Sequence, residues 1–325
     1  MVKVSICVPI YGVEKYIKQC AVSLFEQTYD DIEYIFVNDC TPDKSIKVLE
    51  SVMERYPKRR GQVKIINHSH NLGLAGARNT AVENVTGEFI AHVDSDDWID
   101  TNYIQELVDV AVKNDADIVR CDVTKEYPDH SAVRHFKYYA DKERMLQLMV
   151  GELDIVSHAI WGAIYKTRLY KDNAIKAKVG VNHGEDYSVT PALTLCANKI
   201  LHISKPFYHY RIGNENSYMN NIKIGSLLQL KEANLYLSDF FRKHSVLTKY
   251  ADSIGRGRLS IPLVAMENKL DAKSLINDGY LEIDGQSTVF RILSRLAELS
   301  IDIRNRFLLR ACCKIYKQLL IYKFA

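Results

Sequence analysis

The chain has 325 residues, of which 47% are hydrophobic and 26% are charged, the composition of an ordinary globular protein. Its net charge of +3 is too small to indicate a nucleic-acid partner. No stretch approaches the ~20 apolar residues of a transmembrane helix. The seven cysteines form no Cys-x-x-Cys pair and the chain begins in a strand, without a signal-peptide layout. We therefore expect reduced thiols and a cytoplasmic protein.

The first part of the chain alternates between strand and helix signals. Short apolar runs predict strands at Val2–Ile10, Ile32–Val37, Val63–Ile66, Phe89–Val93 and Ile118–Val123. Helical spacing separates these strands at Val13–Gln27, Ser45–Arg55, Ala75–Val85 and Tyr103–Lys113. Strands separated by single helices predict βαβ units, and hence an α/β fold with a mainly parallel sheet flanked by helices.

The pattern changes after residue 124. The polar and aromatic segment Tyr127–Tyr139 predicts a hairpin or an excursion, and Ile200–Ile203 predicts a returning strand. Lys142–Val150 is helical, and helical spacing dominates from Ile222 onward, interrupted by a loop at Asn277–Gln286. We therefore expect an α/β domain over residues 1–220 and a smaller helical C-terminal region over residues 221–325.

Three carboxylates follow the predicted strand Phe89–Val93, at Asp94, Asp96 and Asp97. Crowded carboxylates at a strand end favour a hard divalent cation, which prefers oxygen ligands. The alternative is an ordinary Asp-rich turn. A calcium loop counted from Asp94 fails because it lacks the required glycine and glutamate, and the chain has no Walker-type loop.

Two segments lie at the carboxyl ends of predicted strands, at Pro9–Tyr11 and Asn38–Asp39. In a parallel sheet the carboxyl ends of the strands form the edge at which ligands bind. We therefore expect these segments to lie with the Asp cluster at one edge.

Three further segments are candidates. Glu185 and Asp186 precede a helical stretch, where acids cap the helix or supply a general base. Arg78 follows a glycine-containing turn and suits phosphate, although a surface arginine is the alternative. His209 and Arg211 are candidate metal or diphosphate contacts, with a structural role as the alternative.

Together these segments resemble the family-two nucleotide-sugar glycosyltransferases with the GT-A fold. The segments that carry the resemblance are Val4–Tyr11, Phe25–Tyr29, Phe36–Asp39, Asn71–Asn79, Gly87–Ile90, Asp94–Asp97, Gly184–Asp186 and Tyr208–Arg211. They cover about the first two-thirds of the chain. Two positions depart from the family pattern: Cys40-Thr41 replaces Gly-Ser after Asp39, and Ala163 replaces a lysine that would contact the acceptor.

The resemblance implies a role for each segment. A nucleoside diphosphate sugar would contact Pro9, Tyr11, Glu14, Asp39, Arg78, Asp94, Ser95 and Arg211, with Asp39 facing the base, commonly uracil. Asp96 would bind Mn²⁺ or Mg²⁺, with His209 as a second candidate, and Asp97 would cap the next turn. Asp186 would be the catalytic base and Glu185 would position the acceptor. The implied reaction is inverting transfer of a sugar to a hydroxyl of a glycan or lipid-linked acceptor, in surface polysaccharide synthesis.

Other classes of protein remain open from the sequence. A nucleotidyltransferase would require a glycine-rich loop after the first strand, where the chain reads Tyr11-Gly12-Val13-Glu14, and an Asp-nucleophile phosphatase fits poorly around Trp98. A non-enzymatic carbohydrate- or partner-binding module is the other alternative. Residues 303–325 are basic and amphipathic, which predicts either a last core helix or a peripheral contact with the inner face of the cell membrane. The C-terminal region is also a candidate for contact with a second copy.

Overall fold

The structure is a computed structural model that describes residues 1–136, 138–151, 158–213, 222–276 and 279–323. It contains two compact units. The first comprises residues 1–138, 159–182 and 193–220, and the second comprises residues 139–158, 183–192 and 221–325. Two segments that precede residue 220 thus group with the C-terminal helices, and the division of the chain at residue 220 stays a prediction.

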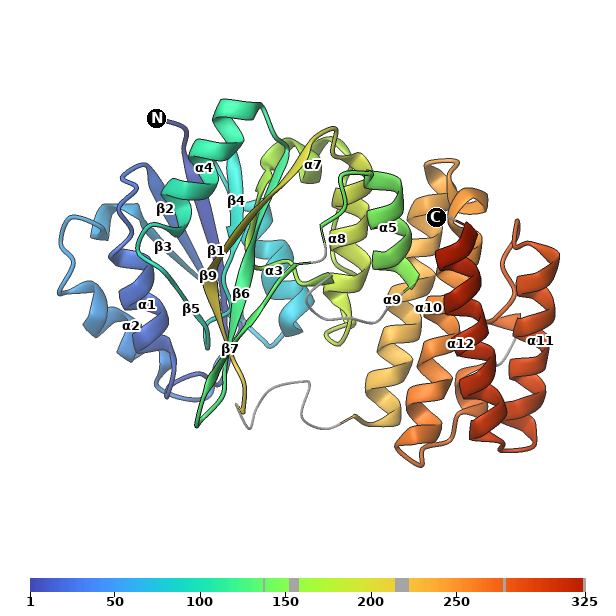
Figure 1. Cartoon of the computed structure of the whole chain (residues 1–325). Helices are drawn as coiled ribbons and strands as arrows, with labels where there is room; N and C mark the ends of the chain where they lie inside the picture. Colours follow the sequence, from blue (N-terminus) through green and yellow to red (C-terminus); the bar gives the residue numbers. More distant parts are fainter. Residues whose placement is uncertain (137, 152–157, 214–221, 277–278, 324–325) are drawn as a thin grey trace. The chain divides into compact units, whose positions relative to one another are not determined.

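The first unit is built on one sheet (Figure 1). Its strands are β1 (Val4–Ile10), β2 (Ile32–Asn38), β3 (Val63–Asn67), β4 (Phe89–His92), β5 (Trp98–Ile99), β6 (Ile118–Glu126), β7 (Ser131–Arg134), β8 (Ala163–Lys166) and β9 (Ile200–Arg211). They lie in the order β3-β2-β1-β4-β8-β6-β9-β5, and β7 pairs with β6.

The direction of the strands divides the sheet. β1, β2, β3 and β4 are parallel to one another, and β6 is parallel to β9. β8 runs antiparallel between β4 and β6, and β5 runs antiparallel to β9. The α/β class is therefore confirmed, but the sheet is mixed rather than mainly parallel. The prediction missed the antiparallel strands β5 and β8, because runs of two and four residues give little periodic signal.

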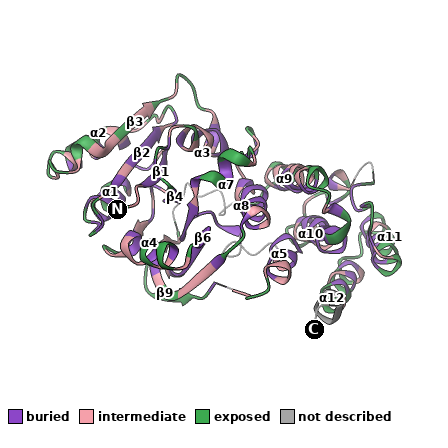
Figure 2. Cartoon of the chain, turned by 90° about the horizontal axis from the view of Figure 1, so that it is seen from above, coloured by how far each residue is buried: buried purple, intermediate pink, exposed green. Residues whose placement is uncertain are grey.

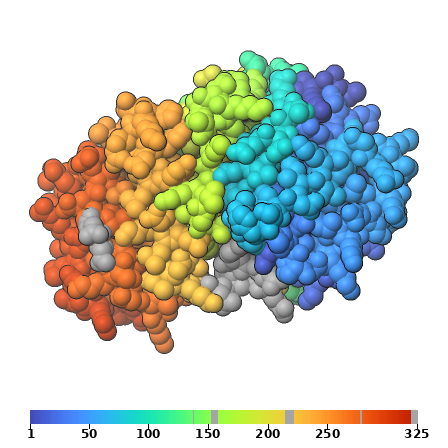
Figure 3. Space-filling model, turned by 180° about the vertical axis from the view of Figure 1, so that it is seen from behind, coloured from blue at the N-terminus to red at the C-terminus, as the bar shows by residue number. Residues whose placement is uncertain are grey.

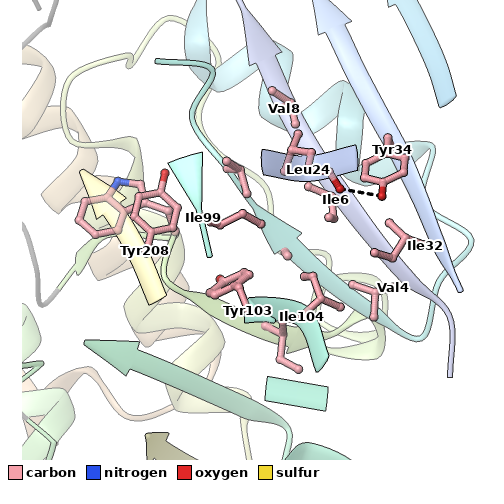
Figure 4. Packing of buried hydrophobic residues seen from close by; sticks show 14 of the residues in the cluster. Val4, Ile6, Val8, Leu24, Ile32, Tyr34, Ile99, Tyr103, Ile104 and Tyr208 are labelled. Atoms are coloured by element: carbon pink, nitrogen blue, oxygen red, sulfur yellow. Dashed lines mark hydrogen bonds between the residues drawn. The ribbon is translucent and has the colours of Figure 1, made fainter. Parts of the chain in front are cut away.

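The helices of the first unit flank its sheet. They are α1 (Ile17–Phe25), α2 (Ser45–Met53), α3 (Gly73–Glu83), α4 (Tyr103–Asn114) and α7 (Thr167–Asp172), with the 3₁₀ turn η1 (Arg60–Gln62). Alternate residues of β1 point into a core that contains Leu24 of α1 and Tyr103 of α4, as Figure 4 shows. The buried Tyr34 hydroxyl donates a hydrogen bond of 2.8 Å to the Leu24 carbonyl. Every residue of β1 is buried, as expected for a strand covered on both faces.

The second unit is helical. It contains α5 (Lys142–Gly151), the first part of α8 (Glu185–Cys196), α9 (Ile224–Lys243), α10 (Leu247–Glu267), the turn η2 (Lys273–Leu275), α11 (Thr288–Asp302) and α12 (Arg306–Lys323). α10 packs against α5, α9, α11 and α12, and it is buried along much of its length (Figure 2). None of the helices formed by described residues combines the length and apolar character needed to cross a membrane.

Candidate functional site

The candidate site is the Asp loop, residues 94–97, which follows β4. The Val93 N–H donates to the Cys7 carbonyl of β1 at 3.1 Å, and the Asp39 N–H donates to the Ile10 carbonyl at 3.0 Å. Because β1, β2 and β4 are parallel neighbours, their carboxyl ends meet at one edge of the sheet. The strand pairing thus places Pro9–Tyr11, Asn38–Asp39 and the Asp loop at that edge.

Two residues of β9 hold the Asp loop in place. The Tyr208 hydroxyl accepts a hydrogen bond from the Asp94 N–H at 3.1 Å and donates to Asp97 Oδ2 at 2.8 Å. The Arg211 N–H donates to Asp97 Oδ1 at 2.8 Å, and Arg211 Nε donates to the Asp96 carbonyl at 2.8 Å. The prediction that Asp97 caps the following turn is wrong, because the fully buried Asp97 carboxylate binds β9 instead.

Aromatic rings support the Arg211 side chain. Its guanidinium lies 4.7 Å from the centroid of the Trp98 ring and 5.0 Å from that of Tyr16. Its terminal nitrogen donates to Gln19 Oε1 at 2.6 Å. Arg211 is thereby fixed beside the Asp loop, and its contact with a diphosphate stays a prediction.

Asp94 forms an ion pair with Arg78. Arg78 Nη2 lies 2.8 Å from Asp94 Oδ1, and the two side chains are 6% and 23% exposed. The alternative of a surface arginine is therefore wrong, because Arg78 is buried behind the loop. Ser95 is also buried, whereas Asp94 and Asp96 are half-buried. Within the loop, Asp94 and Asp96 thus remain partly accessible to a ligand.

The neighbouring carboxylates of the loop raise the affinity of Asp97 for protons. Burial, and then the negative charges of Asp96 and Asp94, raise the pKa of Asp97 well above its ordinary value. Burial and the same three carboxylates raise the pKa of the nearby Cys20 thiol. This concentration of negative charge is what a divalent cation would offset.

The donor set fits a hard cation that keeps much of its own hydration. Among the described residues, no group of three or more His, Cys, Asp and Glu side chains is arranged to enclose a metal ion. Mg²⁺ is commonly held by one or two carboxylates together with water and phosphate oxygens. The half-buried carboxylates of Asp96 and Asp94 match that description.

His209 already has two carboxylate partners. Its Nδ1 lies 2.7 Å from Glu126 Oε1 and its Nε2 lies 3.0 Å from Asp100 Oδ1. The ring stacks on Trp98 with centroids 5.1 Å apart. Binding a metal would require His209 to give up one of these hydrogen bonds, and its role as a ligand stays a prediction.

Asp39 organises the start of α3. Its carboxylate is buried and accepts hydrogen bonds of 2.8 Å from the Leu72 and Gly73 N–H groups. His68 Nδ1 lies 2.7 Å from Asp39 Oδ1. Gly73 has a φ of 78°, which favours glycine because other residues rarely adopt it. Asp39 thus fixes the turn that leads to Arg78, and its contact with a nucleotide base stays a prediction.

The segment after β1 presents one exposed ring. Pro9 is buried within β1, whereas Tyr11 is 50% exposed. The Gly12 N–H donates to Thr41 Oγ1 at 2.8 Å, and Glu14 Oε2 accepts a hydrogen bond of 3.0 Å from the Lys44 N–H. These bonds attach the segment to the loop that follows β2, and the Tyr11 ring is accessible for stacking on a base.

Glu185 and Asp186 begin α8 in the second unit. The preceding Gly184 has a φ of 91°, which other residues rarely adopt, and a Cβ atom there would lie 2.6 Å from Leu230 Cδ1. Glu185 is buried and Asp186 is half-buried. Both acids occupy the first turn of the helix, as capping requires. Their meeting with the Asp loop stays a prediction.

Sequence reasoning did not find the tryptophans of the site. Trp161 stacks on Tyr208 and Tyr210, with ring centroids 4.8 Å and 5.1 Å apart. Trp98 contacts both His209 and Arg211. In the sequence, the signal for Trp98 was its position directly after the Asp cluster. Ala163 is fully buried in β8, two residues beyond Trp161.

Comparisons with known proteins agree with this geometry. Residues 5–176 match the profile of glycosyl transferase family 2. The putative glycosyltransferase EpsH of Bacillus subtilis is 32% identical over 217 residues, which are 64% of this chain and 60% of EpsH. The chain thus spans less than two thirds of the length of this relative.

Two solved structures share the fold. Residues 1–349 of TarS from S. aureus, in complex with UDP-GlcNAc, have a TM-score of 0.66 at 20% identity, covering 97% of this chain and 92% of that one. The mannosyltransferase PcManGT from Pyrobaculum calidifontis, in complex with GDP-Man and Mn²⁺, has a TM-score of 0.54 at 14% identity, covering 100% and 88%. The fold is therefore that of the GT-A glycosyltransferases. The chain belongs to glycosyl transferase family 2, as the resemblance predicted.

Proposed function

We propose that this protein transfers a sugar from a nucleoside diphosphate sugar, with UDP as the nucleotide, to a hydroxyl group of an acceptor. The observation that carries the proposal is the Asp loop, which presents Asp94 and Asp96 at the sheet edge while Tyr208 and Arg211 hold its backbone. Membership of family 2 favours this reaction over nucleotidyl transfer, a phosphatase or a binding module. The UDP-GlcNAc complex of TarS supports UDP as the nucleotide.

Asp96 would hold a Mn²⁺ or Mg²⁺ ion, with Asp94 beside it. A bound divalent ion would neutralise charge that develops on the leaving diphosphate. Arg211 adds a fixed positive charge next to the loop, in an orientation set by Trp98 and Gln19. Such preorganised charge is usually the largest contribution to catalysis. Tyr11 would stack on the base, and Arg78 would hold the Asp94 side chain in its orientation.

Asp186 would act as the general base. It would accept the proton of the acceptor hydroxyl while the hydroxyl oxygen forms a bond to the anomeric carbon. The bond between that carbon and the diphosphate oxygen would break, and UDP would leave with the electron pair. Attack from the face opposite the diphosphate inverts the configuration, so that an α-linked donor gives a β-linked product. Glu185 would position the acceptor.

We further propose a glycan or lipid-linked acceptor in the synthesis of a surface polysaccharide, at the inner face of the cell membrane. TarS is named a poly(ribitol-phosphate) β-N-acetylglucosaminyltransferase, which supports a polymeric surface acceptor for a related chain. In α12 the described basic residues Arg306, Arg310, Lys314 and Lys317 are exposed, whereas Leu309, Cys312 and Tyr316 are buried. This pattern supports a last core helix with a solvated basic face. Flotation with anionic vesicles, with and without residues 303–325, tests peripheral membrane contact.

Release of UDP from a panel of UDP-sugars, with candidate acceptors and Mn²⁺, tests the activity directly. NMR of the product tests inversion, since a β linkage from an α-linked donor is expected. The matched variant is Asp186→Asn, which keeps the size of the side chain and removes the base. Transfer that stays near normal in this variant would contradict the assignment of Asp186.

A further inference from the structure

α11 has two apolar faces. The inner face is buried against α10 and α12 and includes Phe290, Leu293, Ala297 and Ile301. The outer apolar residues are 40–58% exposed: Val289 at 52%, Ile292 at 54%, Leu296 at 40%, Leu299 at 52% and, just beyond the helix, Ile303 at 58%. Figure 2 shows exposed residues along this helix, and in Figure 3 the red segment that contains it lies at the surface. We call these five residues the outer stripe.

The outer stripe has the spacing of a helix–helix seam. Its members follow one another at intervals of three, four, three and four residues, which is the a and d pattern of a coiled coil. At a rise of 1.5 Å per residue, the stripe is about 21 Å long. Exposed apolar residues on the first unit, such as Val112 and Val133, do not form a comparable row. A continuous apolar row of this kind indicates an interface.

The charges of α11 are arranged in a self-complementary order along the helix, and Arg295 and Asp302 are the two that flank the outer stripe. The first half of α11 carries Arg291 and Arg295, and the second half carries Glu298 and Asp302. Two copies of the helix that pair antiparallel would therefore place the basic half of each next to the acidic half of the other. A parallel pair would bring like charges together.

One register satisfies the apolar and the charged residues together. With Leu296 packed against Leu299 of the partner subunit, Ile292 meets Ile303 of the partner subunit. The same alignment brings Arg295 beside Asp302 of the partner subunit, once on each side of the two-fold axis. A two-fold interface of this kind uses the same surface on both copies.

We propose that the outer stripe of α11 is the interface of a homodimer, formed by antiparallel pairing of two α11 helices. A membrane surface fits the stripe less well, because helices that lie on anionic lipid have a polar face rich in Lys and Arg. The polar part of α11 instead carries two acids as well as two arginines. Asp302 also lies 3.0 Å from Lys273, but both side chains are exposed and such a pair contributes little. Asp302 can therefore exchange this partner for Arg295 of the partner subunit.

The first test is sedimentation velocity on the full chain over a range of concentrations. An interface of one helix pair is small, so a monomer–dimer equilibrium near the micromolar range is expected. Leu299→Glu should weaken the dimer roughly tenfold or more, because it places charge at the centre of the seam. The matched control is Val112→Glu on α4, which is 54% exposed in the first unit and should leave dimerisation unchanged.

Exchanging the charges of Arg295 and Asp302 distinguishes a weakened dimer interface from a general loss of folding. Arg295→Asp alone and Asp302→Arg alone should each weaken the dimer, since like charges then face each other. The double variant should restore it, and Lys273→Ala should leave it intact.

A chain that stays monomeric at all concentrations would overturn the proposal, as would a double variant no better than its single parents. Flotation of the monomer on anionic vesicles, lost in Leu299→Glu, would assign the stripe to a membrane and also overturn it.

Discussion

The Tyr208 hydroxyl donates a hydrogen bond of 2.8 Å to the buried carboxylate of Asp97, and it accepts one from the Asp94 N–H. Burial, and then the negative charge of Asp97, raise the pKa of Tyr208 well above its ordinary value, so that the hydroxyl keeps its proton as a donor. A strand far along the chain thus fixes the conformation of the loop proposed to bind the donor. Residues that only position this loop are therefore expected to affect binding of the donor.

Tyr208→Phe should weaken binding of the donor as well as stability. It removes one donor from a buried carboxylate, which costs about 1–3 kcal/mol of unfolding free energy. Because the Asp94 N–H also loses its acceptor, the apparent Kd for UDP should rise roughly tenfold, as for an interaction of about 1.4 kcal/mol. Urea unfolding and calorimetric titration with UDP measure the two effects. The control is Tyr34→Phe, which also loses a buried hydroxyl but should leave the affinity for UDP unchanged.

Asp96→Asn should remove the effect of metal on nucleotide binding while the fold is retained. The Asp96 side chain is half-buried, and the Asp96 contact to Arg211 uses its carbonyl oxygen, which the substitution keeps. Loss of a charged ligand should lower the metal-dependent affinity roughly 100-fold. Titration with UDP in the presence of Mn²⁺ measures this loss of affinity. Asp100→Asn is the matched control, because Asp100 is exposed and bonds His209 instead; an equal loss there would argue against a special role for Asp96.

Arg211→Lys should raise KM for the donor more than it lowers stability. A lysine keeps the charge but cannot reproduce the bonds to Asp96 and Gln19 together with the contact to the Trp98 ring. Steady-state kinetics across donor concentrations measure the change, expected to be about tenfold. Lys205→Ala is a suitable control, since it removes a cation that pairs with Glu106 on the surface. An unchanged KM in Arg211→Lys would show that the charge alone is sufficient.

Asp122 should make stability depend on pH in acid. Burial raises the pKa of this carboxylate, but hydrogen bonds from His135, the Phe136 N–H and His202 outweigh it, and the pKa lies below the ordinary 3.8. A lowered pKa stabilises the fold above the unfolded pKa, and this stability is lost as pH falls through the folded pKa.

Asp122→Asn should therefore be less stable than the unmodified chain at pH 7, by about 1–3 kcal/mol, because it weakens these hydrogen bonds. The difference should shrink as the pH falls from about 4 through the folded pKa, where the unmodified chain loses the same contribution. Urea unfolding at a series of pH values measures the difference. A gap that stays constant down to the lowest pH would contradict the assignment.

The first half of the fold was predictable in large part because its central strands β1 and β4 are buried on both faces. β1 is an unbroken run of buried residues, and α1 repeats apolar residues on one side. The direction of β8 was not predictable, since it depends on pairing with β4 and β6 rather than on local pattern. β9 was expected to end at Ile203 but continues to Arg211, where β5 and β6 pair with it.

The position of the Asp loop at the edge of the sheet was predictable, because Asp94 and Asp96 directly follow the end of a strand. The role of Asp97 was not, because its partner Tyr208 lies 111 residues along the chain. His209 was predicted to be a metal ligand, but in the folded chain it contacts Glu126, which lies 83 residues away in the sequence. Long-range hydrogen bonds thus decide which polar residues remain accessible to a ligand.

Calorimetric titration of the unmodified chain with UDP, once with Mn²⁺ and once with EDTA, tests the central claim most directly. We predict that UDP binds in the presence of Mn²⁺ and that its affinity falls by an order of magnitude or more with EDTA. ATP should show no comparable binding. Equal affinity under both conditions would contradict a metal-dependent donor site at the Asp loop, and absence of binding to any nucleoside diphosphate would contradict the proposed function itself.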